Sequence, residues 1–165
     1  MRKRFITIIS IVLLAGITAC APGISKQVRS QVTFTEPFSQ LQQDPQRFEG
    51  EMAMLGGRII ETRSLDSGTE LVVLQLALDG SDRPRDTDQS QGRFLVQTDQ
   101  FLDPAIYAPG TLITAAGRIK GSDQREIGQM RYSYPIVHLE EIRKWPPSVN
   151  TSPRFHFGVG VGTRF

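Results

Sequence analysis

The amino-acid sequence predicts a mainly β fold: a small OB-like five-stranded antiparallel barrel with one or two short helices, preceded by a cleaved signal peptide. After residue 50, apolar runs rich in β-branched residues alternate with Gly- and Asp-containing turns, which favours short strands. Their order is three strands, a short helix and two strands, as in the OB-fold, where a helix plugs one barrel end. Another small antiparallel barrel or a sandwich is the alternative.

The first element is an export signal that covers residues 1–19. Three basic residues at positions 2–4 precede an apolar run over residues 5–15, which is too short to span about 30 Å of hydrocarbon as a helix. Residues 17–20 (ITAC) resemble the bacterial lipobox, so the segment is predicted to be a cleaved lipoprotein signal peptide. An ordinary cleaved signal with a chance cysteine is the alternative.

Cys20 is the only cysteine of the chain and the predicted lipidation site. In the resemblance to the lipobox, its thiol carries a diacylglyceryl group and its new amine an N-acyl chain such as palmitate. More than one acyl chain holds a protein stably on a bilayer. We therefore expect a membrane partner through this anchor, together with the lipoprotein-processing and sorting machinery. No other cofactor is expected. In the lipoproteins that this segment resembles, an Asp after the cysteine retains the protein at the inner membrane, so the resemblance implies that a chain with Ala21 goes to the outer membrane.

Cleavage changes the charge of the protein. The full chain of 165 residues has a formal net charge of +2, but residues 1–19 carry three basic and no acidic residues. The mature chain of 146 residues therefore has 16 basic and 17 acidic residues, a net charge of −1. A nearly neutral chain has no electrostatic attraction to nucleic acid, so no nucleic-acid partner is expected.

Residues 20–34 contain few apolar residues and are predicted to form a lipidated tether. The OB-like domain is predicted over residues 35–145. Its first helix is expected to begin with Thr35 as N-cap and Pro37 in the first turn, and to end before Asp44.

The barrel strands follow this helix. Gly56 and Gly57 predict a bulge or bend in the first strand, and Pro135 predicts an edge position or a bulge in the fifth. Turns are expected at residues 66–68 and 121–123. The expected strands are 52–63, 69–78, 93–98, 111–120 and 125–142, with a short helical connector at 99–107.

Residues 146–165 are predicted to be a Pro-rich linker and a Phe/Gly/Val tail. Apolar residues alternate with glycine or polar residues over 154–165, the period of a one-sided strand. The tail resembles the last strand of outer-membrane β-barrel proteins, and it could pair with an envelope protein or with copies of itself. A Gly-rich terminus without a partner is the alternative.

Several segments of the domain resemble one family of lipoproteins. They include residues 56–59 (GGRI), 101–104 (FLDP), 108–110 (APG) and 132–135 (YSYP). The chain resembles the Slp family, the starvation-inducible outer-membrane lipoproteins of Gram-negative bacteria, over roughly residues 32–146. The resemblance implies a lipid-anchored, non-enzymatic protein on the periplasmic side of the outer membrane, with an envelope structural or stress- and starvation-associated role.

An enzyme is not expected, because His138 and His156 have no adjacent nucleophile. No metal site is expected either. Asp82, Asp86 and Asp88 lie in one loop and carry the oxygen ligands that Ca²⁺ prefers, but arginines are interleaved with them.

The alternative function is a periplasmic small-ligand or glycan-binding module that uses the barrel face. OB barrels bind ligands around their second and third strands. The candidate ligand-binding residues are Arg58, Arg93, Tyr132 and Tyr134, since Arg and aromatic side chains stack on sugars and bases. Alternatively, the tyrosines fill the barrel wall and the arginines pair with nearby acids.

Overall fold

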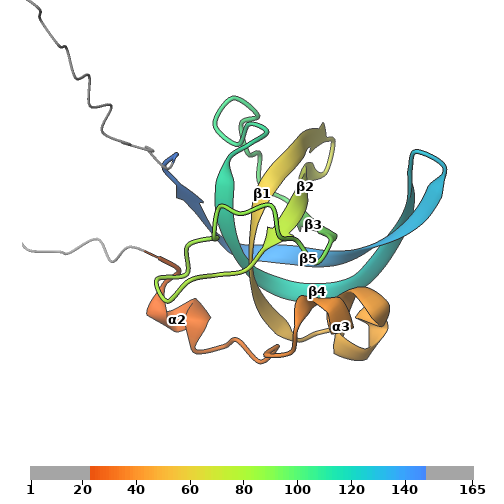
Figure 1. Ribbon diagram of the computed structural model, residues 1–165. Helices are drawn as coiled ribbons and strands as arrows, with labels where there is room; N and C mark the ends of the chain where they lie inside the picture. Colours follow the sequence, from red (N-terminus) through yellow and green to blue (C-terminus); the bar gives the residue numbers. More distant parts are fainter. Residues whose placement is uncertain (1–22, 148–165) are drawn as a thin grey trace, which may run out of the picture.

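A computed structural model describes residues 23–147, and the predictions about the signal peptide, Cys20 and the tail fall outside this range. No helix among these residues has the length and apolar character needed to cross a membrane. The elements, shown in Figure 1, are α2 (Lys26–Arg29), α3 (Phe38–Gln43), the 3-10 helix η1 (Pro45–Phe48), β1 (Met52–Leu65), β2 (Gly68–Leu76), β3 (Arg93–Thr98), β4 (Leu112–Ile127) and β5 (Met130–Trp145).

The five strands form a closed barrel in the order β1-β2-β3-β5-β4, which confirms the predicted fold class. One detail of the prediction is wrong, because β3 and β5 are parallel, with Leu95 opposite Ile136. Five strands that alternate in direction cannot close a ring, so at least one neighbouring pair must be parallel. The other four pairs are antiparallel.

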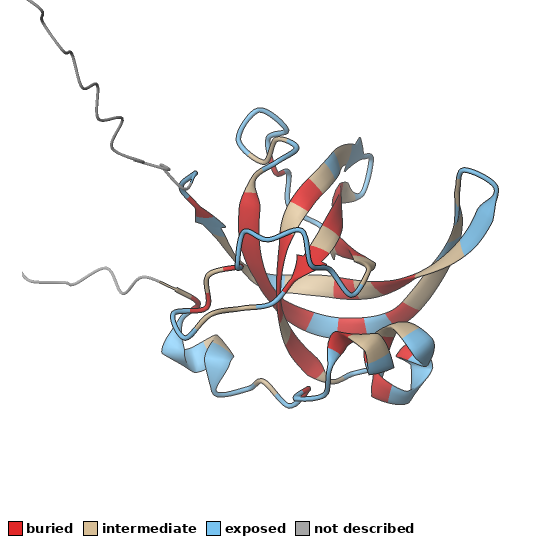
Figure 2. Ribbon diagram, in the orientation of Figure 1, coloured by how far each residue is buried: buried red, intermediate tan, exposed pale blue. Residues whose placement is uncertain are grey.

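Alternate strand residues point into the barrel and form the main core (Figure 2). The predicted bend at Gly56 and Gly57 is displaced, because the register of β1 against β2 shifts between Ile59 and Glu61. The two glycines instead allow close packing, since a Cβ at either position would overlap β2 or Leu78. The main core comprises Phe34, Phe38, Leu41, Phe48, Ala53, Leu55, Ile59, Leu71, Val73, Phe94, Val96, Leu102, Ile113, Ala115, Ile119 and Val137.

The helical plug comes from a different place than predicted. Residues 99–107 form turns, not a helix; the N–H groups of Ile106 and Tyr107 both donate to the Asp103 carbonyl. Pro109 follows two residues after Tyr107 and disfavours helical backbone angles at Ala108, so the turn cannot extend into a helix. Residues of α3 and η1, which precede β1, fill the core instead. The α3 helix starts at Phe38 after Pro37, so the expected Thr35 cap is also wrong.

Residues 23–34 pack against the barrel, which differs from the tether predicted for residues 20–34. Ile24 is buried, and Phe34 packs edge-to-face on Phe48 with ring centroids 5.1 Å apart. The backbone N–H of Phe34 donates to the Met52 carbonyl. Because Ile24 and Phe34 are buried against the rest of the chain, this segment belongs to the domain.

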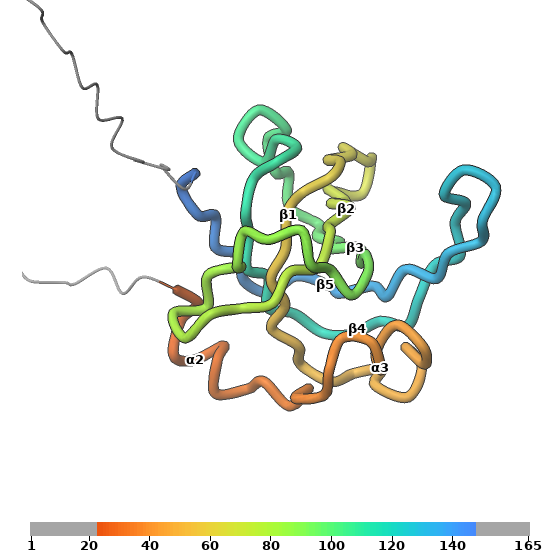
Figure 3. The backbone as a smooth tube through the Cα atoms, in the orientation of Figure 1, coloured from red at the N-terminus to blue at the C-terminus, as the bar shows by residue number. Residues whose placement is uncertain are grey.

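Strands β4 and β5 continue beyond the barrel as a two-stranded hairpin (Figure 3), which we call the arm (residues 120–135). The turn predicted at residues 121–123 is wrong, because pairing continues to Ile127 opposite Met130. Gly121 instead occupies a register irregularity between Ile119 and Ser122, with φ of +84°. Pro135 lies opposite Ser122 beside this irregularity, as its predicted bulge position requires.

Candidate binding face

The arm folds over the outer face of β2 and β3, the face that OB barrels use for ligands. Val72 and Leu95 point outward from these strands, yet both are buried, together with Tyr134 of the arm. Ile60, Ile127, Tyr132 and Ile136 pack against them as a second apolar cluster. The protein therefore covers this apolar cluster with its own chain.

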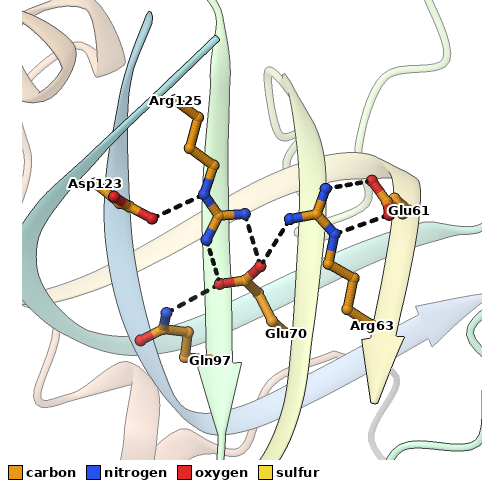
Figure 4. A network of polar contacts seen from close by, with 6 residues as sticks. All are labelled: Glu61, Arg63, Glu70, Gln97, Asp123 and Arg125. Carbon is orange, nitrogen blue, oxygen red and sulfur yellow. Dashed lines mark hydrogen bonds and ion pairs between the residues drawn. The ribbon is translucent and has the colours of Figure 1, made fainter. Parts of the chain in front are cut away.

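A network of charges fixes the arm to the sheet (Figure 4). The Arg125 guanidinium of the arm donates two parallel hydrogen bonds of 2.7 Å to the Glu70 carboxylate of β2. Gln97 of β3 donates a third bond to Glu70, at 3.0 Å. Asp123 accepts a hydrogen bond from Arg125 Nε at 2.8 Å. Arg63 of β1 contacts Glu70 and also forms an ion pair with Glu61 of the same strand. Bidentate Arg–carboxylate geometry makes this a strong, directional contact.

The network changes the acidity of its members. The hydrogen bonds from Arg125 hold the pKa of Glu70 below its usual range, although burial acts in the opposite direction. The same contact raises the pKa of Arg125. Glu61 also has a lowered pKa, because Arg63 donates to it. The Glu70 side chain, only 4% exposed, is therefore a buried anion that its partners neutralise.

The two predicted tyrosines are packing residues in this face. The Tyr132 hydroxyl accepts the backbone N–H of Arg93 at 2.7 Å and a bond from the Gln42 amide. The Tyr132 and Tyr134 rings meet with centroids 4.8 Å apart. Arg125 lies 6.0 Å from the centroid of Tyr134.

The two arginines predicted as binding residues make different contacts. Both lie in one row of the sheet, since Arg58 is opposite Leu74 and Leu74 is opposite Arg93. Arg58 forms an ion pair with Asp86. Arg93 lines a hollow of about 290 Å³ between the arm and the sheet, together with Tyr134 and Arg125. The structure thus brings Arg93, Tyr132 and Tyr134 together and places Arg58 in a different contact.

Sequence reasoning missed Glu70, Arg125 and Arg63. One signal was available, because Glu70 begins the nearly continuous apolar run ELVVLQLAL. A carboxylate in such a strand needs a cationic partner. The identity of that partner depends on how the arm folds back, which local sequence patterns do not determine.

A larger hollow, of about 730 Å³, lies at one end of the barrel. Ile106, Leu112, Lys144 and Trp145 line it with the prolines that end the described chain. Asp86 and Thr111 line it as well, so its lining is partly polar and partly apolar.

Two of the three loop aspartates considered for Ca²⁺ form ion pairs. Asp82 and Asp86, from the loop considered for Ca²⁺, pair with Arg29 and Arg58. His138 lies in β5 opposite Gln97 and Arg118. No group of three or more metal-ligating side chains occurs within residues 23–147.

A family comparison decides the identity of the chain. The model of the outer membrane lipoprotein Slp family matches residues 17–159, which include the lipobox-like segment and the whole described domain. The chain belongs to this family. The resemblance seen in the sequence is therefore confirmed, and with it the predicted location in the outer membrane of a Gram-negative bacterium.

Three relatives support the assignment of this Slp family chain. It is 31% identical to an uncharacterized protein of Haemophilus influenzae, over 87% of this chain and 78% of that protein. It is 26% identical to outer membrane protein Slp of Escherichia coli, over 82% of this chain and 72% of that protein. It is 29% identical to the uncharacterized lipoprotein YeaY of Escherichia coli, over 61% of this chain and 52% of that protein, about half its length.

Two solved structures are similar to the Slp family chain. One is a small single-stranded DNA-binding protein from Streptomyces coelicolor, with a TM-score of 0.38, 17% identity, and coverage of 58% of this chain and 94% of that chain. The other is the mitochondrial single-stranded DNA-binding protein Rim1 of S. cerevisiae, with a TM-score of 0.34, 13% identity, and coverage of 58% and 95%.

Proposed function

We propose that the protein is a non-enzymatic envelope lipoprotein, anchored by a diacylglyceryl group and an N-acyl chain on Cys20 and facing the periplasm, with a structural role in stress or starvation. The observation that carries the proposal is the position of Cys20. The only cysteine of the chain ends a lipobox-like segment, and the folded domain begins a few residues later. Processing and sorting enzymes are its expected partners.

The closed arm supports a structural role over ligand binding. A ligand that bound directly on Val72 and Leu95 would have to displace Tyr134. Lifting the arm from the sheet would also break the bidentate bonds between Arg125 and Glu70. The tyrosines and Arg58, predicted as binding residues, make internal contacts instead.

The anchor is tested by replacing its attachment atom. Cys20→Ala removes the thiol, so the protein should lose its acyl groups and leave the outer-membrane fraction as unprocessed or soluble material. The matched control is Ala21→Ser, which keeps the lipobox cysteine. Mass spectrometry of the purified protein and membrane flotation measure both properties. Mature Cys20→Ala protein that still floats with outer membranes would refute the anchor.

A further inference from the structure

We propose that a defined face of the domain lies against the bilayer, with Lys26, Arg29 and Arg83 among anionic lipid headgroups. The face consists of α2, the loop at residues 79–84 and the end of β5, and we call it the anchor face. The inference rests on the proposed acylation of Cys20 and adds an orientation and a lipid contact to it.

The first argument is the length of chain between the lipid and the fold. Ile24 is buried and Ser25 donates two hydrogen bonds to Glu141, of 2.9 and 2.6 Å. Four residue steps separate Cys20 from Ile24, so even a fully extended chain spans at most about 14 Å. A domain of about 125 residues has a radius of gyration of about 14 Å and is thus roughly 30 Å or more across. A link this short cannot let the far side of the domain reach the bilayer.

The second argument is that the anchor face is held together by polar contacts. Arg29 pairs with Asp82, whose carbonyl accepts from the Thr114 hydroxyl. The same hydroxyl accepts the Trp145 indole N–H at 2.9 Å. The segment that follows the lipid is therefore connected to the loop, to β4 and to β5, and it moves with the barrel.

The third argument is charge. In the Arg29–Asp82 pair the arginine side chain is 46% exposed and the aspartate 7%, so the pair presents its cation to the outside. Lys26 is exposed and has no ion pair within the described range. Arg83 donates to the Pro146 carbonyl and lies 5.7 Å from the Trp145 ring centroid, again with no acidic partner in residues 23–147. Basic side chains beside a membrane anchor are attracted to anionic headgroups.

The arm marks the opposite side of the molecule. Figure 1 shows α2 and the end of β5 on one side of the barrel and the arm on the other. Met130, at the tip of the arm, is 73% exposed. The anchor face and the arm tip therefore provide a near and a far position for measurement.

The test uses the full-length acylated protein in vesicles of phosphatidylethanolamine and phosphatidylglycerol. A fluorophore is attached at Lys26→Cys, Arg83→Cys or Met130→Cys, since the acylated Cys20 thioether does not react with thiol reagents. Quenching by a headgroup-labelled lipid should be at least about threefold stronger at positions 26 and 83 than at 130, given a domain roughly 30 Å across. Equal quenching, or stronger quenching at position 130, would overturn the orientation.

The lipid contact is tested by charge reversal. In the double variant Lys26→Glu with Arg83→Glu, repulsion from anionic headgroups replaces attraction. The difference in quenching between a probe at Gln27→Cys and a probe at Met130→Cys should therefore fall by about half. Lys120→Glu with Arg131→Glu, on the arm, is the matched control and should keep the full difference. An unchanged difference in the first variant would overturn the electrostatic contact.

Mass spectrometry of each sample separates the two proposals. Protein without acyl groups would refute the proposed anchor, and this inference with it. Acylated protein in which the probes at positions 26, 83 and 130 are quenched equally would refute only the inference.

Discussion

Glu70 shows how one residue determines where a long segment lies. Its carboxylate is buried in an apolar strand, where an unpaired charge would be strongly destabilising. Arg125, 55 residues later in the chain, supplies the two parallel bonds that compensate it. The position of the arm is thus set largely by this pair and by the apolar contacts of Tyr134.

We expect Glu70→Gln to lower the free energy of unfolding by about 2 kcal/mol, because the amide cannot accept both guanidinium bonds and the charge attraction is lost. Urea denaturation followed by circular dichroism measures this. Glu61→Gln is the control; its exposed ion pair with Arg63 should contribute less than about 1 kcal/mol. Equal losses in the two variants would contradict the role assigned to Glu70.

The same carboxylate makes stability depend on pH. The pKa of Glu70 is lower in the folded than in the unfolded state because Arg125 donates to it. Its contribution is therefore complete above the unfolded pKa, about 4.3, and is lost as the pH falls through the folded pKa. The stability difference between the native protein and Glu70→Gln should shrink as the pH is lowered from about 5 to 3. A difference that stays constant over this range would refute the assignment.

At the scale of elements, the main structural role of the arm is to cover apolar residues on the outer face of the sheet. It buries outward-facing Val72 and Leu95, which would otherwise form an apolar patch on the sheet. A barrel without the arm would expose the face that related architectures use for binding.

We expect replacement of residues 122–135 by a short Gly-Asn turn to expose this patch, so that the variant binds a hydrophobic dye several-fold more strongly. Fluorescence of the dye at neutral pH measures it. Met130→Ser is the control, because that side chain is already exposed and its change should leave dye binding unaltered. Unchanged dye binding in the arm variant would show that the face is not covered by the arm.

Local patterns predicted the strands well and the connections poorly. The third strand was predicted at its observed bounds, because a short run of β-forming residues ends in polar residues on both sides. Gly121 was interpreted as a turn residue, but a β-bulge uses the same positive φ, and only pairing across the arm distinguishes them. At the candidate site, the sequence indicated Arg93 and the tyrosines, whereas Glu70 and Arg125 depend on contacts between distant strands.

At the scale of the whole molecule, the domain begins earlier than the predicted residue 35. Ile24 and Phe34 are buried, and Arg29 pairs with Asp82. The described segment before α3 is therefore part of the barrel's outer layer, and the proposed lipid on Cys20 would lie only a few residues from the folded unit.

We expect a chain that begins at Thr35 to be less stable than one that begins at Gly23, by about 3 kcal/mol or more. The reason is that burying one Phe or Ile side chain contributes about 1.5–3 kcal/mol. Thermal and urea unfolding of the two chains measure the difference. A chain starting at Ser30 is the intermediate control, since it keeps Phe34 and loses Ile24. Equal stability of all three would restore the interpretation of residues 23–34 as a spacer.

The indole of Trp145 makes one further property of this layer observable. Trp145 is the only tryptophan of the chain, it is 8% exposed, and its N–H reaches Asp82 through Thr114. Its fluorescence spectrum therefore reports, without any added label, on the loop around Asp82, the residue with which Arg29 pairs. If residues 23–34 detach before the barrel unfolds, tryptophan emission will shift to longer wavelength while the circular dichroism of the strands is still unchanged.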